Sequence, residues 1–591
     1  RRAAASRGGD DAAQEPWRGD ADDLLRRVGL AARTVAHAHA RSWPRLLADA
    51  TGGRRRRRPP PERLDDGLTL VDGQVEVDAD ATVRRDVSLG WRAVAAAASR
   101  GTTLGRGSAE RLRAEIAAVG TIPWDERARS AFVAALRSGR EALPALADAD
   151  HMGLLPAALP EWPRVRGRPQ RNPLHRYDLD THLLETVAVL GDIAAGHLDS
   201  SHADLFAGLR DPEVLLVAAL LHDIGKAWPG DHATVGADLA RDWAARMGFD
   251  HRRADRIARL VRLHLLLPDV AGGRDLDDPD EIARVAARVG DVETLDALYL
   301  LSLADARATG PAAWSPWKDS LLARLHARAR ALLVRGDSAA AASHDTREVL
   351  AAAAALLDDP RALDDLLDNL PRRYLVAADA VQIAAHARLL AAAGDGVRAA
   401  IRRGPVAETL VWSVVGADRR GFMADCAGVL AGHGVAVLDA RAFTKPAPGG
   451  GIALDWFVVR DHEDVDWAAV EADLRAAVAG EVDVADLVAR RERRRGLRPK
   501  SPPIAVPVAV TVERQPTLIR AEVRAVDAPG LLYRLTRALA DLGVDVVGAR
   551  AGTLGAEVRD VFFLRPVGGG PDLTAVEASL RAAAGGGAAA G

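Results

Sequence analysis

The most constraining stretch of the sequence is residues 211–226, DPEVLLVAALLHDIGK. Its middle, residues 214–221, is an uninterrupted apolar run, so we expect this segment to be buried on all sides. The run ends in His222 and Asp223, which brings an imidazole and a carboxylate side by side into the protein interior. Buried polar groups of this kind must be paired, hydrogen-bonded or bound to a metal ion.

Other ionisable residues also interrupt apolar helical segments or open the next helix. Imidazole and carboxylate ligands together suit divalent transition metals and, with more oxygen, magnesium. Two such ions ~3.5–4 Å apart can activate a water molecule and hold both oxygens of a phosphoryl displacement. We therefore expect Asp223 to bridge two ions and Lys226 to hold a phosphate oxygen as a point charge. The predicted metal ligands are His182, His222, Asp223, His232, His264 and Asp305.

A structural interpretation competes with the metal centre for each residue taken alone. A single histidine on an apolar helix is usually a satisfied core residue, and His264 by itself fits that interpretation. The adjacent pair His222 and Asp223 by itself leaves both interpretations open. The whole set, each member polar among apolar neighbours, favours the metal.

Composition narrows the class of protein. A chain of 591 residues is too long for one core and predicts several domains. A formal net charge of −3 gives no general attraction to nucleic acid or to an anionic membrane, and no apolar run approaches the ~20 residues that cross a bilayer. The single cysteine, Cys426, excludes an internal disulfide framework and is expected to be a core residue. We expect a cytoplasmic protein with no nucleic-acid or membrane partner.

The C-terminal third contains an internal repeat. Asp418 and Gly421 open a turn before a helix, and Asp527 and Gly530 open the same turn exactly one repeat, 109 residues, later. Each copy is expected to form a βαββαβ module of about seventy residues. The N-terminus of a helix after such a turn suits a carboxylate, so these four residues are predicted to bind an amino-acid effector. The alternative is that one or both copies only pack or dimerise.

The expected fold class is multidomain, with a mainly α-helical phosphohydrolase core and two C-terminal α+β modules. Leu68 to Val83 alternates apolar and polar residues around Asp72-Gly73, which predicts a hairpin. The five arginines of residues 54–58 precede prolines and are interpreted as a solvated linker. The predicted boundaries are 1–62 for a disordered N-terminus and helical remnant, 63–173 for an α/β connecting region, 174–335 for the metal-bearing domain, 336–405 for a helical linker, 406–489 for the first module, 490–516 for a linker and 517–591 for the second module.

Spacing and motifs together resemble a known family. His182 lies 40 residues before His222 and Asp305 lies 82 residues after Asp223, which resembles the HD metal-dependent phosphohydrolases. In more detail the chain is similar to the bifunctional uridylyltransferase/uridylyl-removing enzymes that modify the PII nitrogen-regulatory protein, which end in two ACT domains. The segments that carry this resemblance are 152–160, 175–182, 218–226, 230–232, 261–267, 304–309 and 314–322.

The resemblance implies a function for the predicted centre. It implies hydrolysis of a tyrosyl phosphodiester on PII with release of UMP, supported by Mg²⁺ or Mn²⁺. Asp223, Lys226 and His232 would be the catalytic residues, and glutamine bound at the ACT domains would favour removal. The family's N-terminal nucleotidyltransferase domain is not evident in this sequence, and residues 20–47 look like its tail. We therefore expect no uridylyl transfer from this chain.

Two other functions remain open at the level of sequence. The first is hydrolysis of a guanosine polyphosphate alarmone, because those enzymes also combine an HD domain with an ACT domain. The second is a non-catalytic regulatory protein that responds to glutamine.

Overall fold

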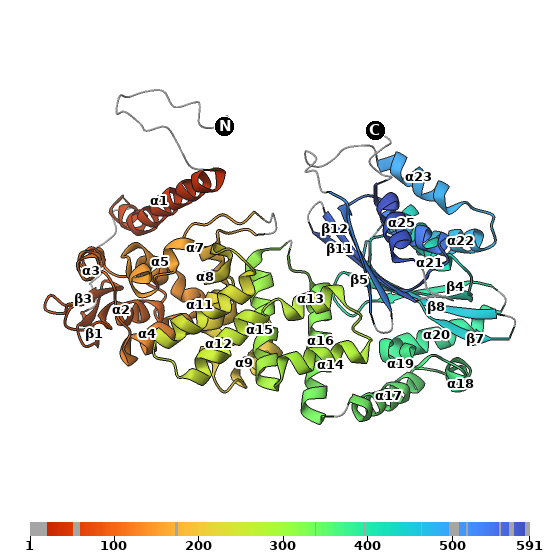
Figure 1. Cartoon of the computed structure of the whole chain (residues 1–591), viewed down its shortest axis with the longest axis horizontal. Helices are drawn as coiled ribbons and strands as arrows, with labels where there is room; N and C mark the ends of the chain where they lie inside the picture. Colours follow the sequence, from red (N-terminus) through yellow and green to blue (C-terminus); the bar gives the residue numbers. More distant parts are fainter. Residues whose placement is uncertain are drawn as a thin grey trace, which may run out of the picture. The chain divides into compact units, whose positions relative to one another are not determined.

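The structure is a computed structural model of the chain (Figure 1). It describes residues 20–50, 60–171, 175–311, 313–336, 338–394, 396–448, 450–462, 464–495, 507–515, 518–554, 557–565 and 572–585. The predicted disordered residues 1–19 and the arginine run therefore lie outside the described residues. Within the described part of the chain, no helix is both long and apolar enough to cross a membrane.

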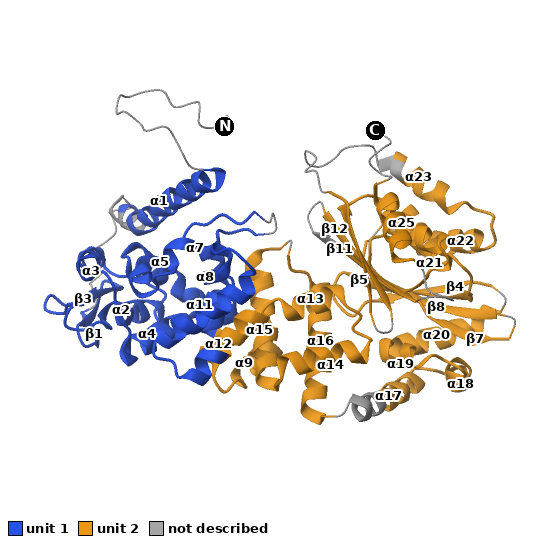
Figure 2. Ribbon diagram, in the orientation of Figure 1, with its two compact units in different colours: residues 1–192, 216–255 blue, residues 193–215, 256–591 orange. Residues whose placement is uncertain are grey.

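The chain divides into two compact units (Figure 2). Unit 1 contains residues 1–192 and 216–255, and unit 2 contains residues 193–215 and 256–591. The elements that begin in unit 1 are α1 (Ala21–Ala50), β1 (Glu62–Asp65), β2 (Leu68–Val71), β3 (Gln74–Val77), α2 (Leu89–Ala98), α3 (Arg106–Val119), α4 (Glu126–Arg137), η1 (Gly139–Ala142), α5 (Leu143–His151), α6 (Leu154–Ala158), α7 (Trp162–Val165), α8 (Leu179–Ala194), η2 (Ile224–Ala227), α11 (His232–Arg246) and α12 (His251–Leu263).

Unit 1 is mainly helical, with one small sheet at its N-terminal side. The predicted hairpin is present, because β2 and β3 pair across Asp72 and Gly73, both of which have positive φ. A third strand, β1, pairs antiparallel with β2 and was not predicted. The helices pack around an aromatic cluster of Trp91, Trp124, Phe132 and Trp243.

Helix α1 is joined to the rest of unit 1 by ion pairs. Arg33 Nη1 lies 2.6 Å from Asp180 Oδ2, and Asp148 Oδ1 lies 2.7 Å from His37 Nε2 and 2.5 Å from Arg41 Nη1. Both carboxylates are almost completely buried. The segment predicted to be a helical remnant is therefore one long helix that pairs with Asp180, two residues before His182.

Unit 2 contains the remaining helices and a large sheet. The elements that begin in it are α9 (Ser200–Ala207), α10 (Pro212–Leu221), α13 (Leu266–Gly273), α14 (Pro279–Val289), α15 (Val292–Thr309), α16 (Pro316–Arg335), α17 (Ser338–Ala355), α18 (Arg361–Leu367), α19 (Arg372–Ala377), α20 (Ala380–Ala393), β4 (Arg398–Arg403), β5 (Thr409–Ala417), α21 (Phe422–Gly432), β6 (Val437–Arg441), β7 (Thr444–Ala447), β8 (Gly450–Arg460), α22 (Trp467–Val478), α23 (Val484–Arg495), β9 (Ala509–Arg514), β10 (Ile519–Val526), α24 (Leu531–Asp541), β11 (Asp545–Leu554), β12 (Glu557–Arg565) and α25 (Leu573–Gly585).

The two repeats share one antiparallel sheet. Its strand order is β4-β5-β8-β6-β11-β12-β10-β9, and β7 pairs with β8 beside this path. The repeats meet where β6 pairs with β11, with Ala440 opposite Ala549. Their helices α21 and α24 also pack together, and a Cβ at Gly428 would come within 2.7 Å of the Tyr533 ring. Close packing of this kind makes the two repeats a single module with a shared core that includes the buried Cys426.

Both repeats contain the predicted order of strand, helix, two strands and helix, as β5-α21-β6-β8-α22 and as β10-α24-β11-β12-α25. A further edge strand, β4 or β9, precedes each of these segments in the chain. The sheet therefore begins inside the predicted linkers 336–405 and 490–516. Apolar and polar residues do not alternate clearly along these two edge strands. No residue of β4 is fully buried, and most of β9 is exposed.

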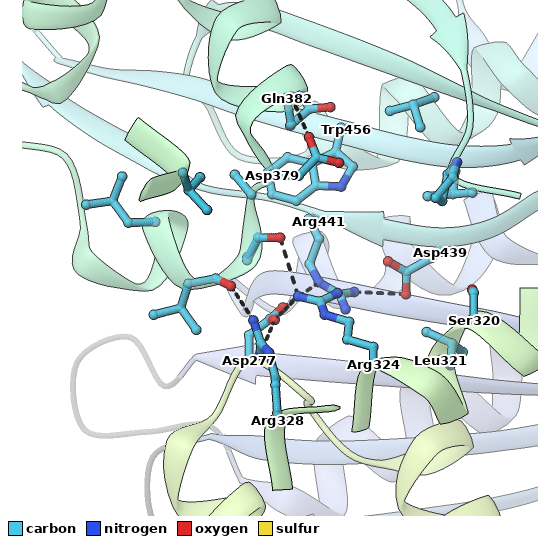
Figure 3. Close-up of a pocket in the computed structure, with 18 of the residues that line it drawn as sticks. Asp277, Ser320, Leu321, Arg324, Arg328, Asp379, Gln382, Asp439, Arg441 and Trp456 are labelled. Carbon is cyan, nitrogen blue, oxygen red and sulfur yellow. Dashed lines mark hydrogen bonds and ion pairs between the residues drawn. The ribbon is translucent and has the colours of Figure 1, made fainter. Parts of the chain in front are cut away.

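The two faces of the sheet have different neighbours (Figure 1). Helices α21, α22, α24 and α25 belong to the core on one face, whereas α17, α18, α19 and α20 pack against β5 and β8 on the other. A cavity of about 520 Å³ lies on this second side, lined by α16, α19, α20 and the strands of the first repeat (Figure 3).

Candidate metal centre

The apolar run of residues 214–221 forms most of helix α10, as predicted, and every residue from Val214 to Ile224 is buried. After Leu221 the backbone leaves the α-helix, and residues 224–227 form the short helix η2. Gly225 is essential to this turn, since a Cβ there would lie 2.1 Å from the carbonyl oxygen of His232. The absence of a side chain thus lets η2 approach the first turn of α11.

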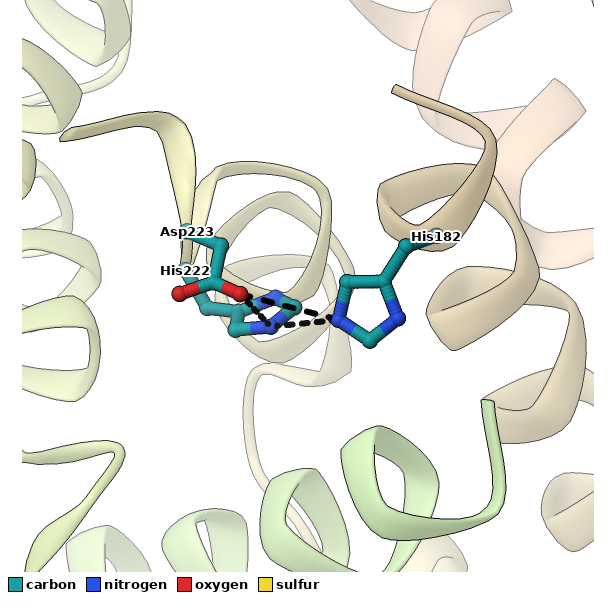
Figure 4. Close-up of side chains that lie close together, drawn as sticks. All are labelled: His182, His222 and Asp223. Carbon is teal, nitrogen blue, oxygen red and sulfur yellow. Dashed lines mark hydrogen bonds and ion pairs between the residues drawn. The ribbon is translucent and has the colours of Figure 1, made fainter. Parts of the chain in front are cut away.

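Three predicted ligands of unit 1 come together at this turn (Figure 4). Helix α8 provides His182, whose Nε2 lies 3.2 Å from Nε2 of His222 and 3.7 Å from Oδ2 of Asp223. His222 Nε2 lies 3.5 Å from the same carboxylate oxygen. The exposed fractions are 1% for His182, 0% for His222 and 3% for Asp223, so bulk water does not surround this group.

The proton positions on His222 favour a cation in this group. His222 Nδ1 lies 2.8 Å from the carbonyl oxygen of Ala219, which can only accept, so Nδ1 carries the proton. In a neutral ring Nε2 is then an acceptor, and it faces the Asp223 carboxylate. Two acceptors this close in a buried site repel each other unless a positive charge lies near them, and either the Lys226 ammonium group or a bound metal ion can provide it. A histidine whose second nitrogen donates to a backbone carbonyl is also the usual arrangement of a metal ligand.

His232 and Lys226 approach the other side of Asp223. Asp231 caps helix α11 by accepting a hydrogen bond from Thr234 N, and His232 is the first residue of that helix. His232 Nε2 lies 3.6 Å from Asp223 Oδ1, and Lys226 Nζ lies 2.5 Å from Oδ2. Both carboxylate oxygens thus have nitrogen neighbours, which is the geometry that a bridging ligand requires.

Two residues beside Lys226 were not assigned a role from the sequence. Lys226 Nζ donates to Gln170 Oε1 at 3.1 Å and lies 3.3 Å from His175 Nε2. The His175 ring also lies 5.3 Å from the His182 ring. His175 stands seven residues before His182 in a stretch that carried the family resemblance, whereas the proline-rich surroundings of Gln170 gave no signal.

The last two predicted ligands, His264 and Asp305, belong to unit 2. His264 is buried and follows α12, with Nδ1 2.7 Å from the carbonyl oxygen of Val261, so its Nε2 is also an acceptor. His264 lies between α12, which ends at Leu263, and α13, which begins at Leu266. Asp305 lies inside α15, which continues to Thr309. Their part in the centre remains a prediction.

The donor set fits a divalent metal ion. Imidazole nitrogens and a carboxylate are ligands for Zn²⁺, Mn²⁺, Fe²⁺ and related ions, and a shared carboxylate can hold two of them. The group His182, His222 and Asp223 could hold such an ion, which agrees with the metal dependence of HD-domain hydrolases. A metal ion held there would activate a water molecule and neutralise phosphate charge.

The predicted effector residues form similar turns in the two repeats. Gly421 and Gly530 are the residues before α21 and α24, and both have the left-handed conformation that glycine adopts without strain. Asp418 accepts a hydrogen bond from Thr444 Oγ1 at 2.6 Å. Burial, together with Asp418, raises the pKa of Asp455, and burial together with Asp527 raises the pKa of Asp560 to about 7. Each turn therefore has a buried acidic partner in the same repeat.

Comparison with protein families agrees with this architecture. The HD domain family matches residues 179–308, and the ACT domain family matches residues 519–585. The fold and the buried His-Asp group thus define a helical HD-domain protein with a C-terminal ACT module.

Curated relatives narrow the class further. The chain is 39% identical over 577 residues to the bifunctional uridylyltransferase/uridylyl-removing enzyme of Streptomyces coelicolor, covering 92% of this chain and 66% of the relative. It is 31% identical to the protein of that name from Mycobacterium tuberculosis, covering 92% of this chain and 62% of the relative. For the protein of that name from Caulobacter vibrioides the values are 32%, 78% and 50%. The chain spans between half and two thirds of the length of these relatives, and it belongs to their family.

Proposed function

We propose that this chain removes UMP from uridylylated PII by hydrolysing the phosphodiester bond to the modified tyrosine. The observation that supports this proposal most is the Asp223 carboxylate, with imidazole nitrogens of His182, His222 and His232 at 3.5–3.7 Å from its oxygens. Metal centres of this kind catalyse displacement at phosphorus, which includes hydrolysis of a phosphodiester. The names of the curated relatives include the same uridylyl-removing activity.

The residues of the centre have separate roles in this proposal. His182, His222, Asp223 and Asp305 hold one metal ion, and His232 and His264 assist from the other side of Asp223. Lys226 holds a phosphate oxygen of the substrate. Lys226 now pairs with Asp223, which would bind the metal ion in the loaded enzyme. Gln170 Oε1, 3.1 Å from Lys226 Nζ, would keep the ammonium group oriented. Mg²⁺ and Mn²⁺ are the ions proposed for this site.

Control by glutamine is the regulatory part of the proposal. Glutamine binds at the turns of the ACT repeats, with its carboxylate at a helix N-terminus next to Gly421 or Gly530. The binding favours the hydrolytic state by its higher affinity for that state.

Release of UMP from uridylylated PII tests the proposal. The purified chain is incubated with Mn²⁺ or Mg²⁺, with and without glutamine, and UMP is quantified. We expect metal-dependent release that glutamine increases and that Asp223→Asn removes, whereas Asp242→Asn, an exposed position on α11, retains it. Hydrolysis of a guanosine polyphosphate alarmone in place of uridylylated PII would support the alternative enzyme. Full release by Asp223→Asn would contradict the assigned centre.

A further inference from the structure

The cavity in unit 2 shares no lining residue with the predicted metal ligands or with the glycine turns of the repeats. Its volume of about 520 Å³ is in the range of small-molecule sites. Trp317, Leu321, Leu375, Val411 and Trp456 form apolar walls. Four arginines, Arg324, Arg328, Arg402 and Arg441, line the same cavity.

Three of these arginines, Arg324, Arg328 and Arg441, belong to a group of ion pairs with more positive than negative charge. The carboxylates are those of Asp275, Asp277 and Asp439, all at most 3% exposed. Five guanidinium groups contact them, from Arg324, Arg328, Arg373, Arg441 and Arg550. Three carboxylates facing five guanidinium groups leave an excess of two positive charges.

Arg441 lies between Asp277 and Asp439 and lines the cavity (Figure 3). It is 2% exposed, its Nε lies 3.1 Å from Asp277 Oδ2, and its Nη1 lies 2.9 Å from Asp439 Oδ1. Its Nη2 is buried and has no hydrogen-bond partner among the described residues. A buried donor of this kind is unfavourable unless an acceptor reaches it.

Arg402 provides a second donor from the edge strand β4. Its Nη2 donates to Gln382 Oε1 at 3.1 Å and lies 3.6 Å from Asp379 Oδ1, and its buried Nε has no hydrogen-bond partner within the described part of the chain. Two unsatisfied guanidinium donors beside tryptophan and leucine walls require a ligand that combines an anionic group with an apolar body.

We propose that this cavity is a binding site for a small organic anion that carries a carboxylate or a phosphate on an apolar body. The anionic group accepts hydrogen bonds from Arg441 and Arg402, and the apolar body lies against Trp456 and Leu321. The site shares no residue with the hydrolytic centre, so the two proposals can fail independently.

Calorimetric titration of the full chain, treated with EDTA to empty metal sites, tests the proposal. The probes are phenyl phosphate, phenylacetate, inorganic phosphate and benzyl alcohol. We expect phenyl phosphate or phenylacetate to bind at least ten-fold more tightly than both inorganic phosphate and benzyl alcohol. Only the first two probes combine an anionic group with an apolar ring. Preference between phenyl phosphate and phenylacetate identifies the anionic group. Failure of both to bind, or binding no tighter than the separate halves, would overturn the proposal.

Variants on neighbouring residues of β4 locate the binding. Arg402→Gln is expected to weaken it at least ten-fold and Arg402→Lys less, because lysine keeps the charge but loses the planar donors. Arg403→Gln is the matched control, since Arg403 is 84% exposed and pairs with Asp461. Circular dichroism and thermal melting check that each variant is folded. Equal binding by Arg402→Gln and Arg403→Gln would show that the probe binds elsewhere and would contradict the site.

Discussion

Unit 1 and unit 2 each bury a cluster of charged residues, but the carboxylates have different neighbours. In unit 1, Asp223 lies among the imidazoles of His182, His222 and His232, with Lys226 alongside. In unit 2, Asp277 lies among three guanidinium groups. Arginine is always charged and only donates, so the second cluster neutralises its carboxylate within the protein. A neutral imidazole offers an acceptor, so the first cluster favours an added cation.

The carboxylate of the first cluster thus has mainly imidazole neighbours, whereas the second cluster has more guanidinium groups than carboxylates. Burial alone would raise the pKa of Asp277. The charges of Arg324, Arg441 and Arg328 lower this pKa by more than burial raises it, so it lies well below the ordinary value. Replacing a residue in the first cluster should therefore change activity, and replacing one in the second should change stability.

The largest effect is expected for Asp223→Asn. Loss of the shared carboxylate should lower UMP release roughly 10³-fold or more, because water activation and charge neutralisation are lost together. Stability should change little, since the imidazole acceptors no longer face a carboxylate. UMP release measures the activity, and urea unfolding measures the stability. A variant that loses stability but keeps its activity per folded molecule would contradict the assigned difference between the two clusters.

The next effect is the loss of stability in Asp277→Asn. Three guanidinium groups would remain without their carboxylate, and breaking such a buried pair costs about 3–5 kcal/mol. Because the folded-state pKa of Asp277 is lowered, its contribution is present at neutral pH and is lost as pH falls below about 4. Urea unfolding at pH 7 and pH 3.5 measures the difference, with Asp280→Asn, an exposed neighbour, as the control. Equal stability of the two variants at pH 7 would contradict the assigned role.

Gly225→Ala tests whether the position of His232 beside Asp223 matters for activity. Its Cβ would lie 2.1 Å from the His232 carbonyl oxygen, so α11 must move and carry His232 away from Asp223. We expect a loss of about 1–3 kcal/mol in stability, as for other overpacked sites, together with reduced metal-dependent hydrolysis. Gly272→Ala is the control, because a Cβ there meets nothing within 4 Å. Unchanged activity in Gly225→Ala would mean that the position of His232 is unimportant.

The smallest effect concerns a buried carboxylate with neither kind of neighbour. Burial, with a contribution from Asp527, raises the pKa of Asp560 to about 7, so the folded state keeps it protonated where the unfolded chain ionises. Wild-type stability should therefore fall as pH rises from about 4 to 7, and Asp560→Asn should gain stability relative to wild type over the same range. Unfolding across this pH range measures it, with the exposed Asp541→Asn as the control. A constant difference between wild type and Asp560→Asn would contradict the raised pKa.

The sequence predicted the parts of the molecule where polarity and burial conflict. An apolar run that ends in His222 and Asp223 has few physical solutions, so the centre of the first cluster could be found without a structure. The 109-residue repeat likewise predicted the C-terminal module of two repeats, and Cys426 is in its core as expected. The assignments of site residues to ligand and effector roles remain predictions.

Other features depend on contacts that leave no local pattern. The strands β4 and β9 are too exposed to alternate clearly, so their place at the sheet edges was missed. Gln170 reaches Lys226 across 56 residues of sequence. The arginine-lined cavity joins α16 to β6, and only the fold brings Arg324 and Arg441 to the same carboxylate.

The most direct test of the account is the metal content of the purified chain after incubation with Mn²⁺ and removal of unbound ions. Elemental analysis of wild type and Asp223→Asn, both checked for folding, compares them under the same conditions. We expect wild type to retain tightly bound manganese and Asp223→Asn to retain much less. A wild-type chain that binds no manganese, magnesium or other divalent ion, or equal retention by the two proteins, would contradict the metal centre.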